Sequence, residues 1–583
     1  MSYYNIRQSF FILSSTIKVE ETQKIDKFLQ LLDKSGVCDL LKSKIVHDDS
    51  NKGGRPGFNI YNMLAAIIYS FAFNKASLRN IEDLCTYDLR LIYIMENDTP
   101  TYKTIGNFIN DYIVPNRDEI FALVTKAIFK ECNLKMDKAY IDGSKFEADA
   151  NKYKFVWKPT TFHLKLGDKI RTLLNEYGII RGVPNDGIIN SKIVADKLIE
   201  LNTIISKYDL NIKENKHHKE SYSLMYSYLE KSLEYEEKER ICGPNRNSYF
   251  KTDKDATAMC LKEDYYSGLG SNMHAAYNVQ LCVIYGVISS YIVTQSRNDM
   301  EDFIKIIEKH HEMHKSYPEA ICADAGYGSL KNYSFLKEHN IKNYVKYVSW
   351  EGNVSGRRPS QYRINLDDTI TCLNNNVGHI VLDIKTHPRR ANSLFYKIEG
   401  CNTCDFKDYC KRFMKDKTDD FKIFEVSQDL QRYIQEAEKN LLSPEGIEMR
   451  VNRSSQVEGV FGVIKQDFMY ERFRRTLLEK VSAEFMLVCL GYNIRKLFRF
   501  YSGKAKFEYW KAPIDLEPES FKKPSAKRLS NKANKVKKKS LNEEAKSKYK
   551  YWKEAVKPNF LKVRFFHSPF NTIFCYRMLA LIF

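Results

Sequence analysis

Apolar positions in the first 130 residues recur at helical spacing. The run Ile60–Phe73 is almost wholly apolar, as in a buried helix, and a second segment starts after Ser77, a residue type that favours helix N-termini. A third helix is predicted to open at Thr99-Pro100-Thr101. Two short helices followed by a third predict either a helix-turn-helix that reads DNA or a plain helical bundle, and the pattern leaves both open.

Strand signals from residue 136 onward predict an α/β domain. Lys138–Ser144 is predicted as a strand that ends on the carboxylate of Asp142, and Glu319–Asp324 as another strand that ends on a carboxylate. Between them, Ala275–Val283 and Val287–Thr294 have the spacing of a hairpin. Long charged helices are expected over about 155–250, an amphipathic helix over Asp299–Lys315 and a short strand over Asn343–Val348.

Composition divides the rest of the chain into further parts. Residues from about 350 to 430 are polar and turn-rich, and helix is predicted from about 427 to 500 with one break near Ser443-Pro444. Residues 503–557 contain 17 Lys or Arg against 7 Asp or Glu. We therefore predict a helical DNA-binding region at 1–130, the first part of a core at 131–350, a Cys-containing insertion at 351–430, the helical end of the core at 431–502 and a basic tail at 503–583.

The charge balance indicates the kind of partner. Among 583 residues, 92 are Lys or Arg and 73 are Asp or Glu, which gives a formal charge of +19, and 13% are aromatic. Basic and aromatic side chains together favour a nucleic-acid partner. No apolar run reaches the ~20 residues of a membrane-spanning helix, and the 13 cysteines are mostly isolated, as in a reducing compartment. We expect a cytoplasmic, nucleoid-associated protein with no membrane partner.

Three carboxylates carry the candidate chemistry. Asp142 and Asp324 are predicted at strand ends, and Glu458 lies on a much later helix. Converging carboxylates repel one another unless cations bind between them, and such oxygen ligands suit two Mg²⁺ (or Mn²⁺) ions. Two such ions about 3.5–4 Å apart activate the attacking oxygen and stabilise the leaving oxygen in phosphodiester transfer.

The sequences around these residues narrow the class of protein. Asp142 lies in Tyr-Ile-Asp-Gly-Ser-Lys, Asp324 in Ala-Asp-Ala-Gly-Tyr-Gly and Glu458 in Glu-Gly-Val-Phe-Gly-Val-Ile-Lys. With Gly54-Arg55-Pro56 and the helix after it, these motifs resemble the DDE transposases of bacterial insertion sequences, in the branch with a Cys-bearing insertion before the Glu. The resemblance spans about residues 50–500. It implies an RNase-H-like mixed sheet with flanking helices, catalytic metal-binding Asp142, Asp324 and Glu458, cleavage at the element's ends and attack of a 3′-hydroxyl on target DNA.

Basic side chains near Glu458 are candidates for DNA binding. Lys465 follows Glu458 by seven residues, nearly two helical turns, so both face the same side of a helix and Lys465 can hold a phosphate. Related transposases carry an Arg four residues before the Glu, where this chain has Ser454, and Arg453 is out of register. The candidates are Lys465, Arg453, Arg472, Arg474 and Arg475, the last three interleaved with Phe468, Tyr470 and Phe473 on a predicted helical face that either stacks on DNA or packs in a core.

Four cysteines gather in the predicted insertion. Cys401 and Cys404 form a Cys-x-x-Cys pair, with Cys410 after it and Cys372 before it. Four thiolates would close a structural Zn²⁺ site, and His379 or His387 could replace Cys372 as a ligand. The spacing of Cys410 is not that of a standard zinc knuckle, so zinc and free thiols remain equal alternatives.

The expected partners are terminal inverted repeats, target DNA and further copies of the chain. Two element ends must be cut together, so we expect a homodimer or a larger synaptic assembly. Two alternatives remain open at this point. One is a metal-dependent nuclease that uses the same residues and does not join DNA, and the other is a catalytically decayed transposase copy that only binds DNA.

Overall fold

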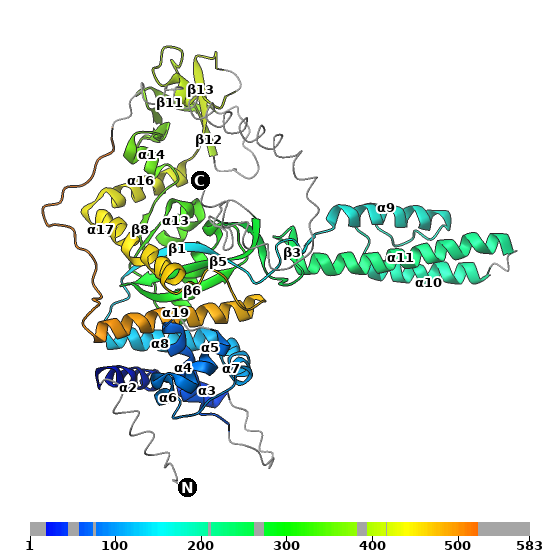
Figure 1. Ribbon diagram of the computed structural model, residues 1–583. Coiled ribbons are helices and arrows are strands. Elements are labelled where there is room, and N and C mark those ends of the chain that lie inside the picture. Colours follow the sequence, from blue (N-terminus) through cyan, green and yellow to red (C-terminus); the bar gives the residue numbers. More distant parts are fainter. Residues whose placement is uncertain are drawn as a thin grey trace, which may run out of the picture. The chain divides into compact units, whose positions relative to one another are not determined.

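The computed structural model describes residues 19–44, 57–73, 77–207, 212–261, 273–381, 393–414 and 417–522 (Figure 1). The chain divides into two compact units, Met1–Trp350 with Ser427–Ser520 and Glu351–Val426 with Phe521–Phe583. Gly54-Arg55-Pro56, His387 and the basic tail from residue 523 onward lie outside the described residues. None of the helices in the described ranges has the length and apolarity that a membrane crossing requires.

A six-stranded mixed sheet lies at the centre of the first unit. Its middle strand β1 (Lys138–Glu147) pairs antiparallel with β5 (Met273–Ile284) and parallel with β7 (Ala320–Ala323). The strand order is β4-β5-β1-β7-β8, and β6 also pairs with β5. The remaining strands are β4 (Thr257–Cys260), β6 (Val287–Thr294) and β8 (Lys342–Val345). An antiparallel half joined to a parallel half, with helices against the sheet, is the predicted RNase-H-like α/β fold.

The predicted hairpin is confirmed, and its turn has the expected backbone. Ile284 and Val287 pair across a two-residue loop of Tyr285 and Gly286, which have φ values of 53° and 70°. Positive φ at both loop residues matches the right-handed twist of the strands, and glycine adopts it without strain. The Nζ of Lys496 donates to the carbonyl of Tyr285 at 2.8 Å, so the turn is held from the last helix of the unit.

The predicted N-terminal helices are present. α4 (Ile60–Ala72) is buried along nearly its whole length, and the side chain of Asn59 accepts the Tyr61 N–H at 3.0 Å at its start. α5 begins after Ser77 as expected, but the Ser77 hydroxyl makes no capping hydrogen bond. The other helices of this region are α2 (Val19–Lys34), α3 (Val37–Ser43), α5 (Leu78–Tyr87), α6 (Leu89–Ile94), α7 (Tyr102–Phe108) and α8 (Val114–Glu131).

One long helix joins these helices to the sheet. α19 (Leu478–Tyr501) is buried along most of its length and packs against β6, α4 and α8 (Figure 1). A Cβ at Gly491 would lie 2.7 Å from the carbonyl carbon of Phe71, so α19 and α4 approach as closely as glycine permits. Helices α12 (Phe303–His314) and α13 (Leu330–Glu338) follow β6 and β7 in the chain.

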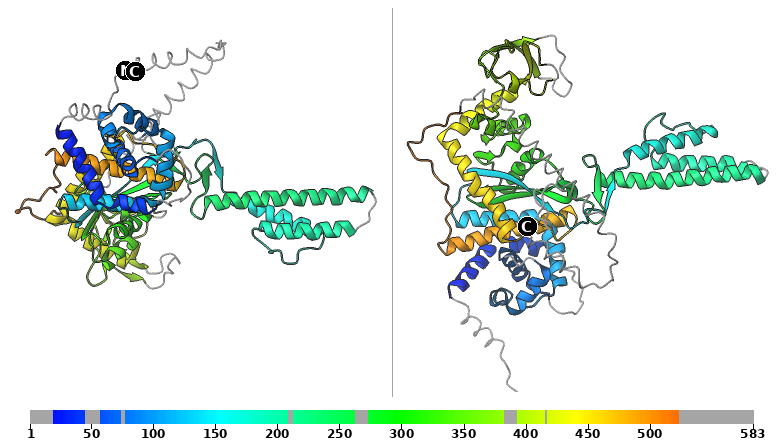
Figure 2. Two further views of the ribbon diagram at one scale, coloured as in Figure 1. Left: turned by 90° about the horizontal axis from the view of Figure 1, so that it is seen from below. Right: turned by 45° about the horizontal axis from the view of Figure 1, so that its top comes forward.

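A helical insertion lies between β1 and β4, where it was predicted. It contains α9 (Thr160–Glu176), α10 (Ser191–Lys207) and α11 (Ile212–Cys242), and it is entered and left through the paired strands β2 (Phe155–Trp157) and β3 (Ser248–Phe250) (Figure 2). The insertion has a small core of its own, to which Leu166, Ile170, Leu198 and Met225 contribute.

The second unit contains strands where only turns were predicted. Five short strands form an antiparallel sheet in the order β13-β12-β11-β10-β9, around a core that includes Ile370, Tyr396 and Val426. Strands of three to seven residues with few apolar positions give too weak a periodicity to detect in sequence. Their bounds are β9 (Tyr362–Ile364), β10 (Ile370–Cys372), β11 (Val377–Val381), β12 (Ser393–Glu399) and β13 (Phe421–Ser427), with the short helices α14 (Trp350–Ser355) and α15 (Lys407–Cys410).

The predicted helix from 427 to 500 has a second break. α16 (Gln428–Leu442) and α17 (Pro444–Arg453) meet at Ser443, as expected, and Ser443 Oγ accepts the Gly446 N–H at 3.0 Å. The chain then leaves the helix between residues 468 and 477, so the continuous helix was wrong. There Arg472 forms a parallel bridge with Glu147 at the end of β1, a tertiary contact that local propensity does not reveal.

Candidate active site

The strand register brings Asp142 and Asp324 to the same level of the sheet. β1 does not end at Asp142 as predicted but continues along β5 to Glu147. β7 pairs with β1 only as far as Ile141↔Ala323 and then ends, so Asp142 and Asp324 are the next residues on the two strands. Equivalent residues of neighbouring parallel strands lie about 5 Å apart and project from the same face. The two carboxylates therefore share one face of the sheet.

Arg453 connects the first of these carboxylates to Glu458. Its Nη2 lies 3.2 Å from Asp142 Oδ2 and its Nη1 donates to Glu458 Oε1 at 2.9 Å. Burial lowers the pKa of Arg453, but the charges of Asp142 and Asp324 more than offset this and leave the pKa raised. We call Asp142, Asp324, Arg453 and Glu458 the acidic cluster.

A π-helical turn explains how Arg453 reaches Glu458. The turn η5 (Ser454–Glu458) lies between α17 and α18 (Gly459–Gly462), and the Gly459 N–H donates to the Ser454 carbonyl, five residues earlier. In an α-helix, residues five apart point about 140° away from each other. The wider turn brings them toward the same side, and such turns are frequent at functional sites. Arg453 precedes Glu458 by five residues instead of four, which in an α-helix would point it away from Glu458. The sequence does not reveal the π-helical turn that accommodates the extra residue.

The environment of Asp142 disfavours its ionised form. The pKa of Asp142 is raised to about 6, chiefly by burial and in smaller part by Asp324 and Glu458, while Arg453 and the Gly143 N–H act in the opposite direction. Glu458 is more accessible, with a side chain that is 49% exposed. A buried carboxylate beside two others is stabilised by a nearby cation, which here is the guanidinium of Arg453.

A hydrogen-bonded chain packs on the other face of β1, behind Asp142 and the end of β7. Tyr327, in the 3-10 turn η3 (Ala325–Tyr327) after Asp324, donates to Gln280 Oε1, and Gln280 Nε2 donates to Asp299 Oδ1 at 2.8 Å. Gln280 pairs with Gly143, where a Cβ would lie 2.3 Å from Gln280 Nε2. The site residues predicted from the sequence did not include Tyr327, although the Gly-Tyr-Gly motif after Asp324 was a signal for it.

Lys465 lies beside the same strand, beyond Asp142. It belongs to a second π-helical turn, η6 (Val463–Asp467), and its Nζ donates to the Lys145 carbonyl at 3.2 Å and lies 4.7 Å from the centre of the Phe146 ring. Three residues along a strand correspond to about 10 Å, so Lys465 lies about that far along β1 from Asp142. Within this distance a cation can contact the next phosphates of a DNA strand bound at the acidic cluster.

The aromatic residues after Glu458 face the core. Phe468, Tyr470 and Phe473 are all at least 96% buried, and the last two pack around Phe146 and Phe485. Of the alternatives left open by the sequence, core packing therefore holds for these rings. The arginines lie at the rim of this packing. Arg472 pairs with Asp149 at 2.7 Å, Arg475 Nη1 donates to Asn110, and the backbone N–H groups of Arg474 and Arg475 donate to the buried carboxylate of Glu484.

The four clustered cysteines lie in the second unit and form no disulfide. The Asn374 N–H donates to Cys372 Sγ and the Phe406 N–H to Cys404 Sγ, each at 3.4 Å. The pKa of Cys410 is raised to about 11, chiefly by burial and in smaller part by the other three thiols, while Lys422 acts in the opposite direction. The zinc site remains a prediction, because across the described part of the chain no three His, Cys, Asp or Glu side chains are arranged as ligands of one ion.

The carboxylates of the acidic cluster are among the described residues and are likewise not arranged as ligands of one ion. Their oxygen atoms nevertheless suit a divalent cation. Three carboxylates are the hard oxygen ligands that Mg²⁺ binds. The guanidinium of Arg453 contacts one oxygen of Asp142 and one of Glu458. A metal ion held by these oxygens would therefore require Arg453 to release them.

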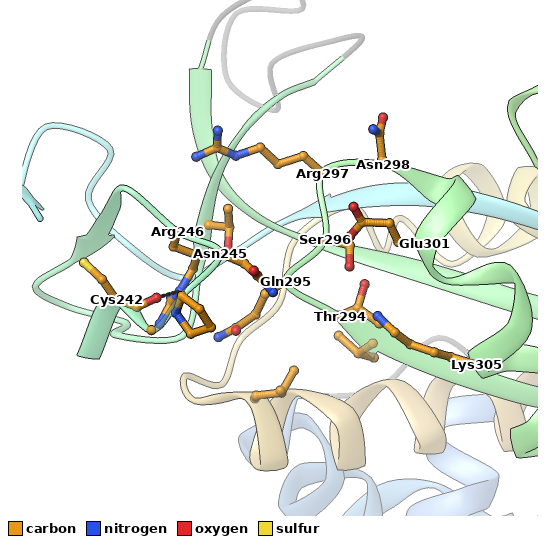
Figure 3. A pocket seen from close by; sticks show the side chains of 15 residues that line it. Cys242, Asn245, Arg246, Thr294, Gln295, Ser296, Arg297, Asn298, Glu301 and Lys305 are labelled. Atoms are coloured by element: carbon orange, nitrogen blue, oxygen red, sulfur yellow. Dashed lines mark hydrogen bonds between the residues drawn. The ribbon is translucent and has the colours of Figure 1, made fainter. Parts of the chain in front are cut away.

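A polar cavity of about 650 Å³ lies elsewhere in the first unit, between the foot of the insertion and the end of β6 (Figure 3). Arg246 forms one wall, and its guanidinium donates to the carbonyls of Cys242 at 3.1 Å and Lys254 at 2.8 Å. Thr294 and Lys305 line the opposite side. None of Asp142, Asp324 and Glu458 is among its described lining residues, so this cavity is separate from the acidic cluster.

Comparison with known families agrees with this architecture. A family model described as "Transposase DDE domain" matches residues 371–498, and one described as "Transposase domain (DUF772)" matches residues 14–111. The first match contains Glu458 but not Asp142 or Asp324. No curated protein and no solved structure matches the chain. The two matches to transposase domains, together with the mixed α/β core, indicate a DDE transposase of the insertion-sequence type.

Proposed function

We propose that the acidic cluster cleaves DNA at the ends of the element and transfers the freed strands into target DNA. The observation that carries this proposal is the pair of contacts made by Arg453, which links Asp142 on the central strand to Glu458 on a distant helix. These ion pairs join two acids from segments that are far apart in sequence. Asp324 lies next to Asp142, at the end of β7, the strand beside β1.

Asp142, Asp324 and Glu458 would hold the divalent ions, Mg²⁺ or Mn²⁺. Bound ions would activate the attacking oxygen and stabilise the leaving one in phosphodiester transfer. Arg453 neutralises the carboxylates until it exchanges them for a DNA phosphate, for which a guanidinium is well suited. Lys465 holds the strand farther along β1.

The remaining site residues act on the DNA outside the cluster. Arg472, Arg474 and Arg475 lie on the loop that returns to the end of β1, where their cations would contact the backbone of the bound end. The transposase would act as a homodimer or larger synaptic assembly, because two ends must be cut together.

The test is cleavage and joining of labelled DNA that carries the sequence flanking this gene, with Mg²⁺ and with chelator. Asp324→Asn and Glu458→Gln preserve side-chain shape and remove a charge, and Glu471→Gln does the same at an exposed acid of the nearby loop. We expect the first two variants to lose cleavage while they still bind DNA, and Glu471→Gln to cut normally.

The joining step separates the proposal from its alternatives. Cleavage at the element's ends, with no joining to target DNA even when a 3′-hydroxyl end is supplied, would indicate a nuclease. Binding without cleavage by the unaltered chain would indicate a decayed copy. Cleavage that survives both Asp324→Asn and Glu458→Gln would overturn the assignment of the acidic cluster.

A further inference from the structure

Large aromatic rings are exposed on strand β2 and just before it, at the start of the helical insertion. Tyr153, Phe155 and Trp157 are 79%, 43% and 64% exposed. Phe155 and Trp157 alternate along the strand and therefore project from the same face, with ring centres 5.4 Å apart in an edge-to-face arrangement. Adjacent exposed rings of this size mark a surface that binds a partner rather than a random surface position.

Several lysines lie beside these rings. Between Asp149 and Asp168 the chain has four lysines and no acidic residue. The Nζ of Lys152 lies 5.5 Å from the centre of the Tyr153 ring, and Lys251, just beyond β3, donates its N–H to the Lys154 carbonyl at 2.9 Å. Rings interleaved with cations suit a partner that has flat apolar groups and anions, which describes the bases and phosphates of nucleic acid.

The exposed rings lie beyond the end of β1 that leads away from the acidic cluster. β1 runs from Asp142 to Glu147, a distance of about 16 Å, and Lys465 lies against it on the way. At its end, a cavity of about 450 Å³ is lined by residues that include Glu147, Tyr153 and Arg472. A DNA strand that follows β1 away from the cluster would therefore pass Lys465 and Arg472 before it meets Tyr153.

We propose that Tyr153, Phe155 and Trp157 form a stacking surface for unpaired bases of the DNA strand that leaves the acidic cluster. The inference rests on the proposed function, because that function provides the cut end and its direction. Stacking tolerates any base, so this surface contributes affinity for unpaired DNA without sequence preference.

The experiment measures DNA binding by the full chain in chelator, with Asp324→Asn present so that the probe stays intact. The probes are a short fluorescent oligothymidylate and a blunt duplex, compared by anisotropy at one salt concentration. The variants are Trp157→Ala, the conservative Trp157→Phe, and Phe162→Ala as a matched control, since Phe162 is an equally exposed ring on α9. Both positions are exposed, so their substitution leaves the core intact, which thermal unfolding verifies.

We expect Trp157→Ala to weaken oligothymidylate binding about 5-fold or more, as for loss of a stacked base. Trp157→Phe should restore most of the affinity, and neither the duplex probe nor Phe162→Ala should show a change. An unchanged affinity of Trp157→Ala for the oligothymidylate would overturn the proposal, and so would an equal loss for the duplex. If Trp157→Ala changes only the oligomeric state in sedimentation, the rings form a subunit interface and the proposal is also wrong.

The two proposals fail in different measurements. Loss of the stacking surface would appear in the binding affinities of chelated protein. Failure of the acidic cluster would appear as cleavage by Asp324→Asn in the presence of Mg²⁺, whereas the binding experiment contains chelator and does not measure cleavage.

Discussion

Arg453 and Glu458 are five residues apart on one helix, yet the guanidinium of Arg453 donates to Glu458 Oε1 at 2.9 Å. The π-helical turn between them makes this contact geometrically accessible. The same guanidinium contacts Asp142 on the central strand. One arginine thus links the helix that carries Glu458 to the strand that carries Asp142, and its removal has consequences for both charge and fold.

Arg453→Gln is expected to destabilise the protein by about 1–3 kcal/mol at pH 8, because a buried carboxylate loses its cation. The loss should shrink at pH 5, where Asp142 takes up a proton, and cleavage should fall at all pH values. Urea unfolding at the two pH values measures the first effect. Arg450→Gln is the control, because Arg450 pairs with Glu519 outside the cluster and should lose about 1 kcal/mol equally at both pH values. Equal behaviour of the two variants would contradict the role given to Arg453.

Asp142→Asn is expected to stabilise the protein at high pH. Burial raises the pKa of Asp142 from its ordinary 3.8 to about 6, so its contribution to stability is complete below pH 3.8 and is lost as the pH rises through 6. The neutral amide avoids this loss and should add about 1–3 kcal/mol at pH 8 and almost nothing at pH 4. Thermal unfolding across this pH range checks the sign, and a destabilised Asp142→Asn at pH 8 would refute it.

Gly143→Ala is expected to cost about 1–3 kcal/mol in the free energy of unfolding, because its Cβ would lie 2.3 Å from the buried amide of Gln280. Gly462→Ala is the matched control, since a Cβ there meets nothing within 4 Å. Shortening the neighbour in Gly143→Ala/Gln280→Ala should cost less than the sum of the single changes. A strictly additive double-mutant cycle would show that the two side chains do not compete for space.

Glu484 holds the loop that carries the arginines. Its buried carboxylate accepts the N–H groups of both Arg474 and Arg475. Glu484→Ala leaves both donors unpaired and should cost about 2–5 kcal/mol. Burial raises the pKa of Glu484, so the charge itself is unfavourable, and Glu484→Gln, which keeps an acceptor, should be close to neutral at pH 7. Chemical denaturation distinguishes the two, and an equal cost for both would show that the charge, and not the acceptor, holds the loop.

Local patterns in the sequence were sufficient to predict several of the elements. Apolar spacing located α4 and the hairpin of β5 and β6, because side-chain periodicity and turn residues depend only on neighbours in the chain. Motifs of a few residues around Asp142, Asp324 and Glu458 indicated the transposase family, since the chemistry restricts which residues can surround the acids. Short strands such as β9 and β10 lacked that local signal and were missed.

The way these parts meet depends on long-range packing that local sequence patterns do not contain. The register of β1 against β7 placed Asp142 level with Asp324, and the π-helical turn rotated Arg453 toward Glu458. The loop after Glu458 left the helix to pair with the end of β1, which buried Phe473 instead of exposing it. Each outcome depends on contacts between segments distant in sequence, whose packing energy exceeds the local preference for a continuous α-helix or a shorter strand.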